Sequence, residues 1–225
     1  MILYTVTGDP GHEGYQDIAL SGDLTGKSIY VNMTNRCPCN CVFCLLHTKE
    51  MRESHSLWLK EGEPSVESVL TLFAGYDLSV VPEVVFCGFG EPLERFEDVC
   101  QVADALKAQY PSLKIRVNTI GLANLIHGRD ITPEFKGRID TVSISLNAPD
   151  AGEFLSLTRS RFGIESFEAV KEFAVLSKQY VPHVVMSVIE HVMSEEKIAR
   201  CREICEALGV TLRVRAYEEP SEAGN

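Results

Sequence analysis

The chain has 225 residues, enough for one domain with a sizeable hydrophobic core. Its formal net charge of −11 argues against an extended nucleic-acid-binding surface, which would need a basic face. The first ten residues, MILYTVTGDP, lack the basic region of a signal peptide, and no later stretch is long and apolar enough to span a membrane. We therefore expect a cytoplasmic protein with neither a membrane nor a nucleic-acid partner.

The first 27 residues contain one possible strand, at 2–6, followed by a loop rich in Gly and Asp. We interpret residues 1–27 as an extension of a core domain that spans 28–225.

From residue 28 onward, short β-branched runs alternate with longer segments of helical spacing. Strands are predicted at 28–34, 83–88, 113–119, 140–148, 183–190 and 210–218, and helices at 65–76, 94–109, 164–180 and 194–208. This alternation is typical of right-handed βαβ units and a parallel sheet. Six units are too few for a closed barrel of eight, so we expect an α/β fold with a partial, laterally open (β/α)6 barrel. A flat doubly wound sheet is the alternative.

Half of the eight cysteines lie within eight positions, as Cys37, Cys39, Cys41 and Cys44. In a reducing compartment such crowding indicates metal or redox chemistry rather than disulfides. The spacing C-x3-C-x2-C of Cys37, Cys41 and Cys44 allows three thiolates to hold three irons of one 4Fe–4S cluster, which leaves the fourth iron open to another ligand. A zinc site with Cys39 as fourth ligand is the alternative, although zinc ligands usually come as two separated pairs. We assign Cys39 no role.

A second motif, VVFCGFGEP, closes the second predicted strand of the core with the turn Gly88, Phe89, Gly90, Glu91 and Pro92. Glycines let the backbone approach a ligand closely and expose carbonyl groups that accept hydrogen bonds from an ammonium group. Cys87, directly before the turn, either lines the site or is a small buried hydrophobic residue.

Strand alternation predicts a polar concave face, because successive side chains point to opposite faces of a sheet. The side chains expected on that face are Asn32, Thr34, Arg116, Asn118, Ser143, Ser145, Asn147, Arg213, Arg215 and Tyr217. Barrel interiors are normally filled by aliphatic residues, so this polar set indicates a cavity that holds a ligand. Arg213 and Arg215 are expected to bind a substrate carboxylate or phosphate; the alternative is that they pair internally with Glu83 or Glu190.

The sequence resembles the radical S-adenosylmethionine superfamily in the stretch CPCNCVFC, with the aromatic Phe43 before the third cysteine, and in the ending Gly-Glu-Pro of the turn. The family turn is G-G-E-P, where this chain has G-F-G-E-P. The resemblance implies an enzyme in which Cys37, Cys41 and Cys44 hold a 4Fe–4S cluster. In that family S-adenosylmethionine binds the open iron and is cleaved reductively to a 5′-deoxyadenosyl radical, which abstracts hydrogen from a substrate.

The same resemblance implies the cofactor-binding residues. The turn Gly88, Phe89, Gly90 and Glu91 would meet the methionine amino group, and Phe43 would lie beside the cluster. Asn118, Ser145 and Asn147 would hold the ribose, Ile189 would contact the cofactor, and Arg159 or Arg161 would pair with the methionine carboxylate. A flavodoxin- or ferredoxin-type protein would supply the electron.

Four stretches, SLWLKEGEPSVESVL, VVFCGFGEP, GLANLIHGRDI and SISLNAPD, resemble the TatD-associated members of that superfamily over residues 28–217. This implies a TatD-type hydrolase as a possible partner and leaves the substrate open. The alternatives are an iron–sulfur electron-transfer or binding protein that does not cleave the cofactor, a 7-carboxy-7-deazaguanine-synthase-like enzyme and a glycyl-radical activase. Cys201, Cys205 and His127 are expected to be structural.

Overall fold

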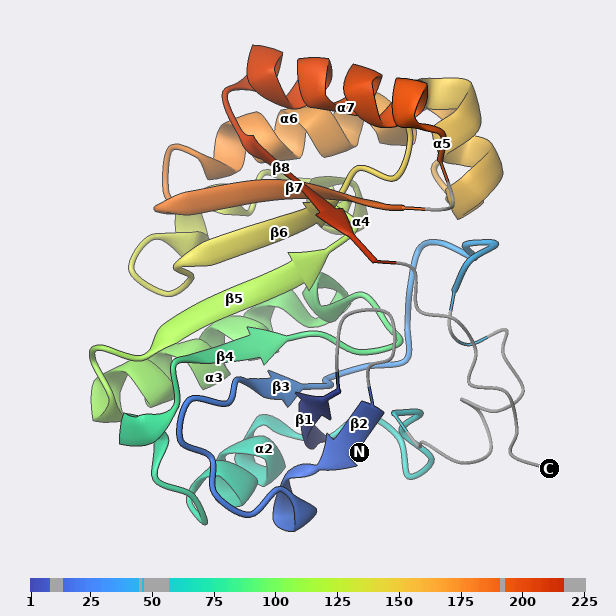
Figure 1. Cartoon of the computed structure of the whole chain (residues 1–225). Helices are drawn as coiled ribbons and strands as arrows, with labels where there is room; N and C mark the ends of the chain where they lie inside the picture. The colour runs from blue at the N-terminus through green and yellow to red at the C-terminus, as the bar shows by residue number, and fades with distance from the viewer. Residues whose placement is uncertain (9–13, 45, 47–56, 191–192, 217–225) are drawn as a thin grey trace, which may run out of the picture.

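The computed structural model describes residues 1–8, 14–44, 46, 57–190 and 193–216. Eight strands within these ranges form one sheet in the order β2-β1-β3-β4-β5-β6-β7-β8 (Figure 1). The parallel strands are β3 (Ile29–Val31), β4 (Glu83–Phe86), β5 (Lys114–Thr119), β6 (Thr141–Ser145), β7 (His183–Ile189) and β8 (Thr211–Arg215).

Each parallel strand lies beside the next one in the chain, whereas a doubly wound sheet reverses its order at a switch point. The sheet is curved and not closed, which confirms the predicted open barrel and excludes the flat alternative.

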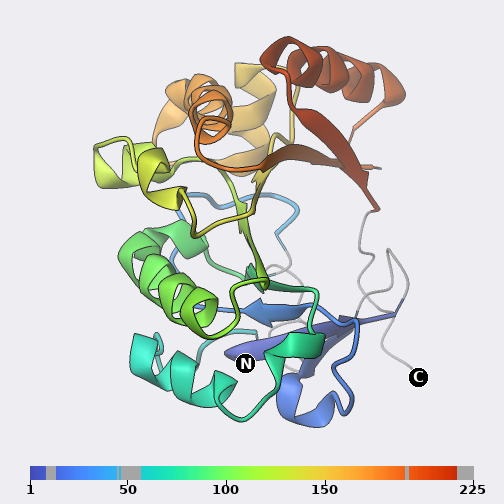
Figure 2. The same ribbon diagram turned by 90° about the vertical axis from the view of Figure 1, so that its left-hand side faces the viewer.

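Helices cover one face of the sheet (Figure 2). They are α2 (Val66–Phe73), α3 (Phe96–Gln109), α4 (Ala123–His127), α5 (Ala151–Thr158), α6 (Ser166–Ser177) and α7 (Glu195–Leu208). The described ranges also contain the short 3-10 helices η1 (Ile18–Leu20), η3 (Leu78–Val80), η4 (Pro92–Arg95), η5 (Thr132–Phe135) and η6 (Gly163–Glu165). None of the helices in the described ranges is long and apolar enough to cross a bilayer.

Helix ends follow the expected chemistry. Ser65 caps the first turn of α2 through its side chain, and Gly209 ends α7 in a left-handed conformation with φ 64°. The pattern did not predict α5 or the five-residue helix α4.

The N-terminal residues extend the same sheet. β1 (Leu3–Thr7) pairs antiparallel with both β2 (Gly14–Asp17) and β3, so the strand predicted at 2–6 is present, shifted by one residue. Tyr4 is 1% exposed, and its ring stacks on Tyr30 with centroids 5.2 Å apart. The hairpin therefore covers the edge of β3 that would otherwise be unpaired.

The main core lies between the helices and one face of the sheet. Alternate strand residues enter it, including Val84 and Phe86 of β4 and Val142 and Ile144 of β6, all completely buried. Cys201 and Cys205 of α7 belong to this core, as expected. Val214 alternates with the inward residues Arg213 and Arg215, and it is 38% exposed because β8 is the edge strand. The opposite, concave face carries the polar residues of the site.

Candidate active site

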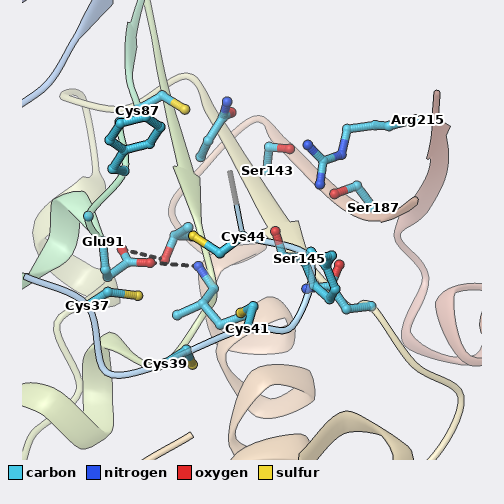
Figure 3. A pocket seen from close by; sticks show the side chains of 18 of the residues that line it. Cys37, Cys39, Cys41, Cys44, Cys87, Glu91, Ser143, Ser145, Ser187 and Arg215 are labelled. Carbon is cyan, nitrogen blue, oxygen red and sulfur yellow. Dashed lines mark hydrogen bonds between the residues drawn. The ribbon is translucent and has the colours of Figure 1, made fainter. Parts of the chain in front are cut away.

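A pocket of about 240 Å³ opens at the carboxyl ends of β4 to β8 (Figure 3). Its walls are the cysteine loop, the turn after β4 and the inward side chains of the following strands. From the loop come Cys37, Cys39, Cys41, Phe43 and Cys44, and from the turn Cys87, Gly88, Phe89, Gly90 and Glu91. Segments far apart in the sequence, from Cys37 to Arg215, thus converge at the strand ends where parallel α/β folds place their ligands.

Backbone hydrogen bonds fix the cysteine loop against the end of α5. The amides of Asn40 and Val42 donate to the carbonyls of Thr158 and Leu157, each at 2.9 Å. On the other side, the amide of Glu91 donates to the carbonyl of Arg36 at 2.7 Å. The loop is therefore held in place by the protein on both sides of the thiols.

The thiols of the loop differ in their proton affinity. Hydrogen bonds with the thiols of Cys37 and Cys41 raise the pKa of Cys39 far above its ordinary value, and the same contact with Cys39 lowers the pKa of Cys41. The thiolate is the form that binds metal. Among the described residues, no three His, Cys, Asp or Glu side chains are grouped so that they could hold a single ion. The thiols of a cluster-binding loop bind separate irons and need not converge on one point.

The turn after β4 packs directly on the cysteine loop. A Cβ atom on Gly90 would lie 2.2 Å from the carbonyl oxygen of Thr34 and 2.7 Å from that of Arg36, and one on Gly88 would lie 2.2 Å from Oδ1 of Asn32. Real Cβ atoms do not approach so closely, so only glycine allows this packing. Phe89 is 8% exposed and packs with Tyr4 and Leu57, which anchors the turn to the N-terminal hairpin.

The carboxylate of Glu91 connects the turn to the end of β5. It accepts hydrogen bonds from the amides of Leu93 and Ile120, at 3.0 and 2.7 Å, and from the Thr119 hydroxyl at 2.8 Å. The side chain is buried, and its burial raises the pKa of Glu91 to about 7. These protein contacts occupy the carboxylate, so the groups that the turn offers to a ligand are backbone groups.

Polar side chains of β5, β6 and β7 line the opposite wall. The residues are Asn118, Ser143, Ser145, Asn147 and Ser187. The side-chain oxygens of Asn118 and Asn147 are buried without a hydrogen-bond partner in the described structure. Asn147 also has a left-handed backbone with φ 55°, which is uncommon outside glycine. Buried acceptors without partners are costly, and a bound ligand with hydroxyl or amino groups would satisfy them.

Sequence reasoning missed Ser187, which is 3% exposed and lines the pocket. It lies beside Ser145 and Arg213 in the registers of β6 with β7 and of β7 with β8. The alternation already applied to β6 and β8 would have found it, since Ser187 and Ile189 are two residues apart on β7.

The three predicted inward arginines divide into two kinds. Arg116 forms an ion pair of 3.0 Å with Glu83. The carboxylate of Glu83 therefore pairs with Arg116 and not with Arg213 or Arg215. Arg213 and Arg215 line the pocket, and Arg215 points toward Ser143 and Ser187 (Figure 3). The pocket therefore joins two arginines of β8 with the thiols of the cysteine loop. Tyr217 lies outside the described residues.

Other predicted residues do not line this pocket. Arg159 is exposed at the end of α5, with φ 48°, and Arg161 forms an ion pair of 3.4 Å with Glu94. Ile189, at the end of β7, is also absent from the lining. Asn32 and Thr34 were expected to face the cavity, but their side chains bond to Leu57 and Glu63 instead. His127 bonds to the carbonyl of Leu93 at 2.7 Å, a structural contact.

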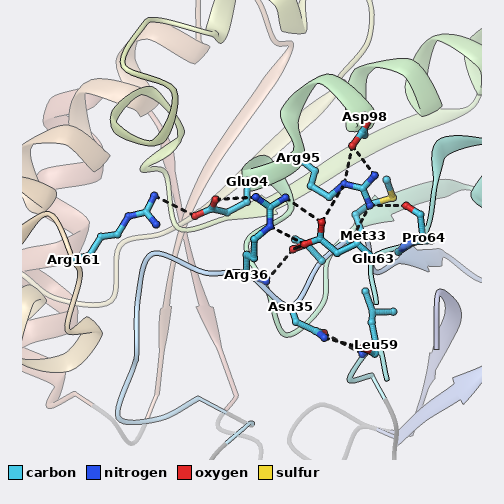
Figure 4. A network of polar contacts seen from close by, with 11 residues as sticks. Met33, Asn35, Arg36, Leu59, Glu63, Pro64, Glu94, Arg95, Asp98 and Arg161 are labelled. Atoms are coloured by element: carbon cyan, nitrogen blue, oxygen red, sulfur yellow. Dashed lines mark hydrogen bonds and ion pairs between the residues drawn. The ribbon is translucent and has the colours of Figure 1, made fainter. Parts of the chain in front are cut away.

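A network of ion pairs fastens the start of the cysteine loop to residues 59–64 and α3 (Figure 4). Nε of Arg36 lies 2.7 Å from Glu63, and Arg95 donates to the carbonyls of Met33 and Pro64 at 2.9 and 2.6 Å. Arg95 also pairs with Asp98 at 2.6 Å. The residues directly before Cys37 are thus held by side chains as well as by the backbone.

Residues 31–206 match the family model of the Radical SAM superfamily, and this match spans well over half of the chain. The chain belongs to the Radical SAM superfamily. Enzymes of this superfamily use a 4Fe–4S cluster and S-adenosylmethionine.

Solved structures share the fold. The chain resembles Streptococcus suis SuiB bound to precursor peptide SuiA, with a TM-score of 0.61, 16% identity, and coverage of 86% of this chain and 40% of that one. SuiB bound to S-adenosylmethionine gives a TM-score of 0.53, 18% identity and coverage of 87% and 40%. A radical SAM methyltransferase from Sphaerobacter thermophilus gives a TM-score of 0.51 and 17% identity, with coverage of 85% of this chain and 66% of that one. The chain thus spans about two fifths of the length of SuiB. No curated protein matches the sequence.

The pocket fits the two groups that the superfamily uses. Thiolates are the donors that iron–sulfur clusters require, and Cys37, Cys41 and Cys44 all line the cavity. The buried, partnerless oxygens of Asn118 and Asn147 face the same space and would accept hydrogen bonds from a polar ligand such as S-adenosylmethionine.

Proposed function

We propose that this protein binds one 4Fe–4S cluster through Cys37, Cys41 and Cys44, binds S-adenosylmethionine beside it, and abstracts hydrogen from an anionic substrate. The bound groups would supply a 5′-deoxyadenosyl radical after one-electron reduction. The observation that carries the proposal is the convergence of the thiol loop, the glycine turn and two arginines on one pocket.

The chain's own residues hold and orient the ligands. Backbone carbonyls of the turn Gly88 to Gly90 would accept hydrogen bonds from the methionine ammonium group, and the side chains of Asn118, Ser145 and Asn147 would bond to the ribose hydroxyls. Phe43 and Phe89 contribute apolar surface, which keeps water from the reacting atoms. Arg161 and Arg159 would need to turn toward the pocket to reach the methionine carboxylate, since neither lines it.

The substrate class follows from Arg213 and Arg215. A guanidinium group keeps its charge in a cavity and binds a carboxylate or phosphate through two parallel hydrogen bonds. The Glu83 carboxylate is engaged by Arg116, and the hydroxyls of Ser143 and Ser187 add donors near Arg215. We infer that the substrate presents an anionic group at this end of the pocket, on the side of the edge strand.

The cofactor assignment is tested with anaerobically purified protein. Addition of S-adenosylmethionine should change the EPR spectrum of the reduced cluster, and dithionite should then yield 5′-deoxyadenosine. An unchanged spectrum at saturating S-adenosylmethionine would favour the alternative, an electron-transfer protein that does not cleave the cofactor.

The substrate assignment is tested with two matched variants once metabolite profiling has identified a substrate. Arg215→Ala should lose more substrate turnover than Arg213→Ala, because Arg215 lies closer to the carboxyl edge of the sheet. Formation of 5′-deoxyadenosine without substrate should continue in both variants. Equal turnover in both variants and the wild type would show that neither arginine binds the substrate.

The expected partners are a flavodoxin- or ferredoxin-type electron donor and a TatD-type hydrolase, in a cytoplasmic setting. The donor is required by electron balance, since reductive cleavage consumes one electron. The proposal of a TatD-type hydrolase as partner rests on the resemblance in sequence motifs. Co-purification of such a hydrolase with this protein from a native host tests it. A 7-carboxy-7-deazaguanine-synthase-like or activase-like reaction is the alternative for the chemistry.

A further inference from the structure

Cys87 is a thiol of the pocket that lies outside the cluster motif. Along β4, Val84 and Phe86 enter the core between sheet and helices, so Glu83, Val85 and Cys87 take the concave face. Cys87 lines the same pocket as the cysteine loop, and Figure 3 shows its sulfur directed into that pocket.

A hydrogen bond to its backbone helps to fix the position of Cys87. The phenol of Tyr4, itself 1% exposed, donates to the carbonyl oxygen of Cys87 at 3.2 Å. Asn118, on the neighbouring strand β5, lines the same pocket. Cys87 is therefore held at the base of the turn, on the wall that continues into β5.

An independent feature indicates that this pocket is built for a ligand. Asn147 follows the carboxyl end of β6, lines the pocket and is 4% exposed. Its side-chain oxygen is buried and has no hydrogen-bond partner in the described structure. Such an acceptor is costly to maintain unless a ligand satisfies it. The thiol and this acceptor share one cavity.

The chemistry of a thiol differs from that of the other groups in this cavity. An S–H bond is weaker than the aliphatic C–H bonds and the hydroxyl O–H bonds that surround it, so a carbon-centred radical takes hydrogen most easily from a thiol. Cys37, Cys41 and Cys44 carry no hydrogen on sulfur when they bind iron. Burial raises the pKa of Cys87, which keeps its thiol protonated and able to give a hydrogen atom.

We propose that Cys87 donates a hydrogen atom to a carbon-centred radical in this pocket. The S–H bond breaks homolytically, a C–H bond forms on the acceptor carbon, and a thiyl radical remains on Sγ. One electron from the flavodoxin- or ferredoxin-type donor and one proton from solvent restore the thiol. This role rests on the proposed function, because the radical arises from cofactor cleavage.

The test needs no substrate. Cluster-loaded protein is incubated in D₂O with S-adenosylmethionine and dithionite, and the deuterium content of the 5′-deoxyadenosine is measured by mass spectrometry. The thiol exchanges with solvent, so the wild type should form 5′-deoxyadenosine with one deuterium at C5′, and Cys87→Ala should lower that labelled fraction at least fivefold. Cys100→Ala, at a thiol of α3 outside the pocket, should match the wild type.

Cys39→Ala is the second comparison, because Cys39 is the other non-ligand thiol of the pocket. Labelling that is lost in Cys39→Ala and retained in Cys87→Ala would overturn the assignment, as would unlabelled product from the wild type. Absence of any 5′-deoxyadenosine from the wild type would instead contradict the proposed function, and the role of Cys87 would fall with it.

A second readout does not depend on turnover. S-adenosylmethionine should slow the alkylation of Cys87 by iodoacetamide several-fold in cluster-loaded protein, as peptide mass spectrometry can measure. Alkylation of Cys100, which is 7% exposed, reports any unfolding. An unchanged rate at Cys87 would place the thiol away from the bound cofactor and contradict the proposal. Cys87→Ser, close in size to cysteine, replaces Cys87→Ala if the smaller side chain impairs folding.

Discussion

At the scale of single residues, the four thiols of the loop are distinguished by spacing and by their contacts. Hydrogen bonds with the thiols of Cys37 and Cys41 raise the pKa of Cys39. We expect Cys37→Ala, Cys41→Ala and Cys44→Ala each to abolish the cluster, and Cys39→Ala to leave iron content unchanged. Iron and sulfide analysis with an absorbance spectrum measures this. Equal iron loss in all four variants would contradict the ligand assignment.

Glu91 predicts a dependence of stability on pH. Burial raises its pKa from an ordinary value of 4.5 to about 7, so the folded protein binds this proton more tightly than the unfolded chain. The resulting stabilisation is complete below pH 4.5 and is lost as the pH rises through 7. The free energy of unfolding should therefore decrease between pH 5 and 8 by up to about 3 kcal/mol from this group.

Anaerobic denaturant titrations at several pH values measure that slope. The glutamine in Glu91→Gln cannot ionise, so the free energy of unfolding of this variant should depend less on pH. The same variant should lose about 1–3 kcal/mol of stability at all pH values, because its amide nitrogen cannot accept the hydrogen bond from the Ile120 amide. An identical slope in wild type and variant would show that another group is responsible.

At the scale of elements, the contact between the turn and the cysteine loop depends on Gly90. Gly90→Ala would place Cβ 2.2 Å from a backbone oxygen just before Cys37, so the loop must move. We expect a several-fold loss of incorporated iron together with weaker binding of S-adenosylmethionine.

Gly152→Ala is the matched control. Its Cβ would lie 3.6 Å from Asp150, an ordinary contact, within the helix α5. This substitution should leave iron content unchanged and raise stability by up to about 1 kcal/mol. Iron content after reconstitution and the thermal midpoint measure both variants. Full iron incorporation in Gly90→Ala would show that the loop tolerates the displacement.

At the scale of the whole molecule, the N-terminal hairpin is part of the core that supports the site. Leu3 of β1 is 2% exposed and packs in the main core, whereas Leu20, just after β2, is 73% exposed. Leu3→Ala should lower the free energy of unfolding by about 2–5 kcal/mol, and Leu20→Ala by less than about 0.5 kcal/mol. Denaturant titration compares the two. Similar small effects would show that residues 1–20 fold independently of the sheet.

The strand positions, their parallel order and the inward set Asn118, Ser143, Ser145 and Asn147 were predictable, because β-branched runs and a period of two are local properties of the chain. The pairing of Arg116 with Glu83 was not, since these residues are 33 positions apart and meet only through the register of β4 with β5. The positions of Arg159 and Arg161 were not predictable either, because they depend on how the loop after α5 packs on the cysteine loop.

The sequence by itself determined the fold class, because strands alternating with helices produce a parallel sheet. It also predicted the donor chemistry, because three cysteines at this spacing are typical of a cluster ligand set. Only the tertiary structure decided that Glu91 braces β5, that Gly90 is required by the cysteine loop, and that Cys87 and Ser187 join one pocket with the arginines. These contacts arise from close packing between segments far apart in the chain, and a local sequence pattern cannot predict such packing.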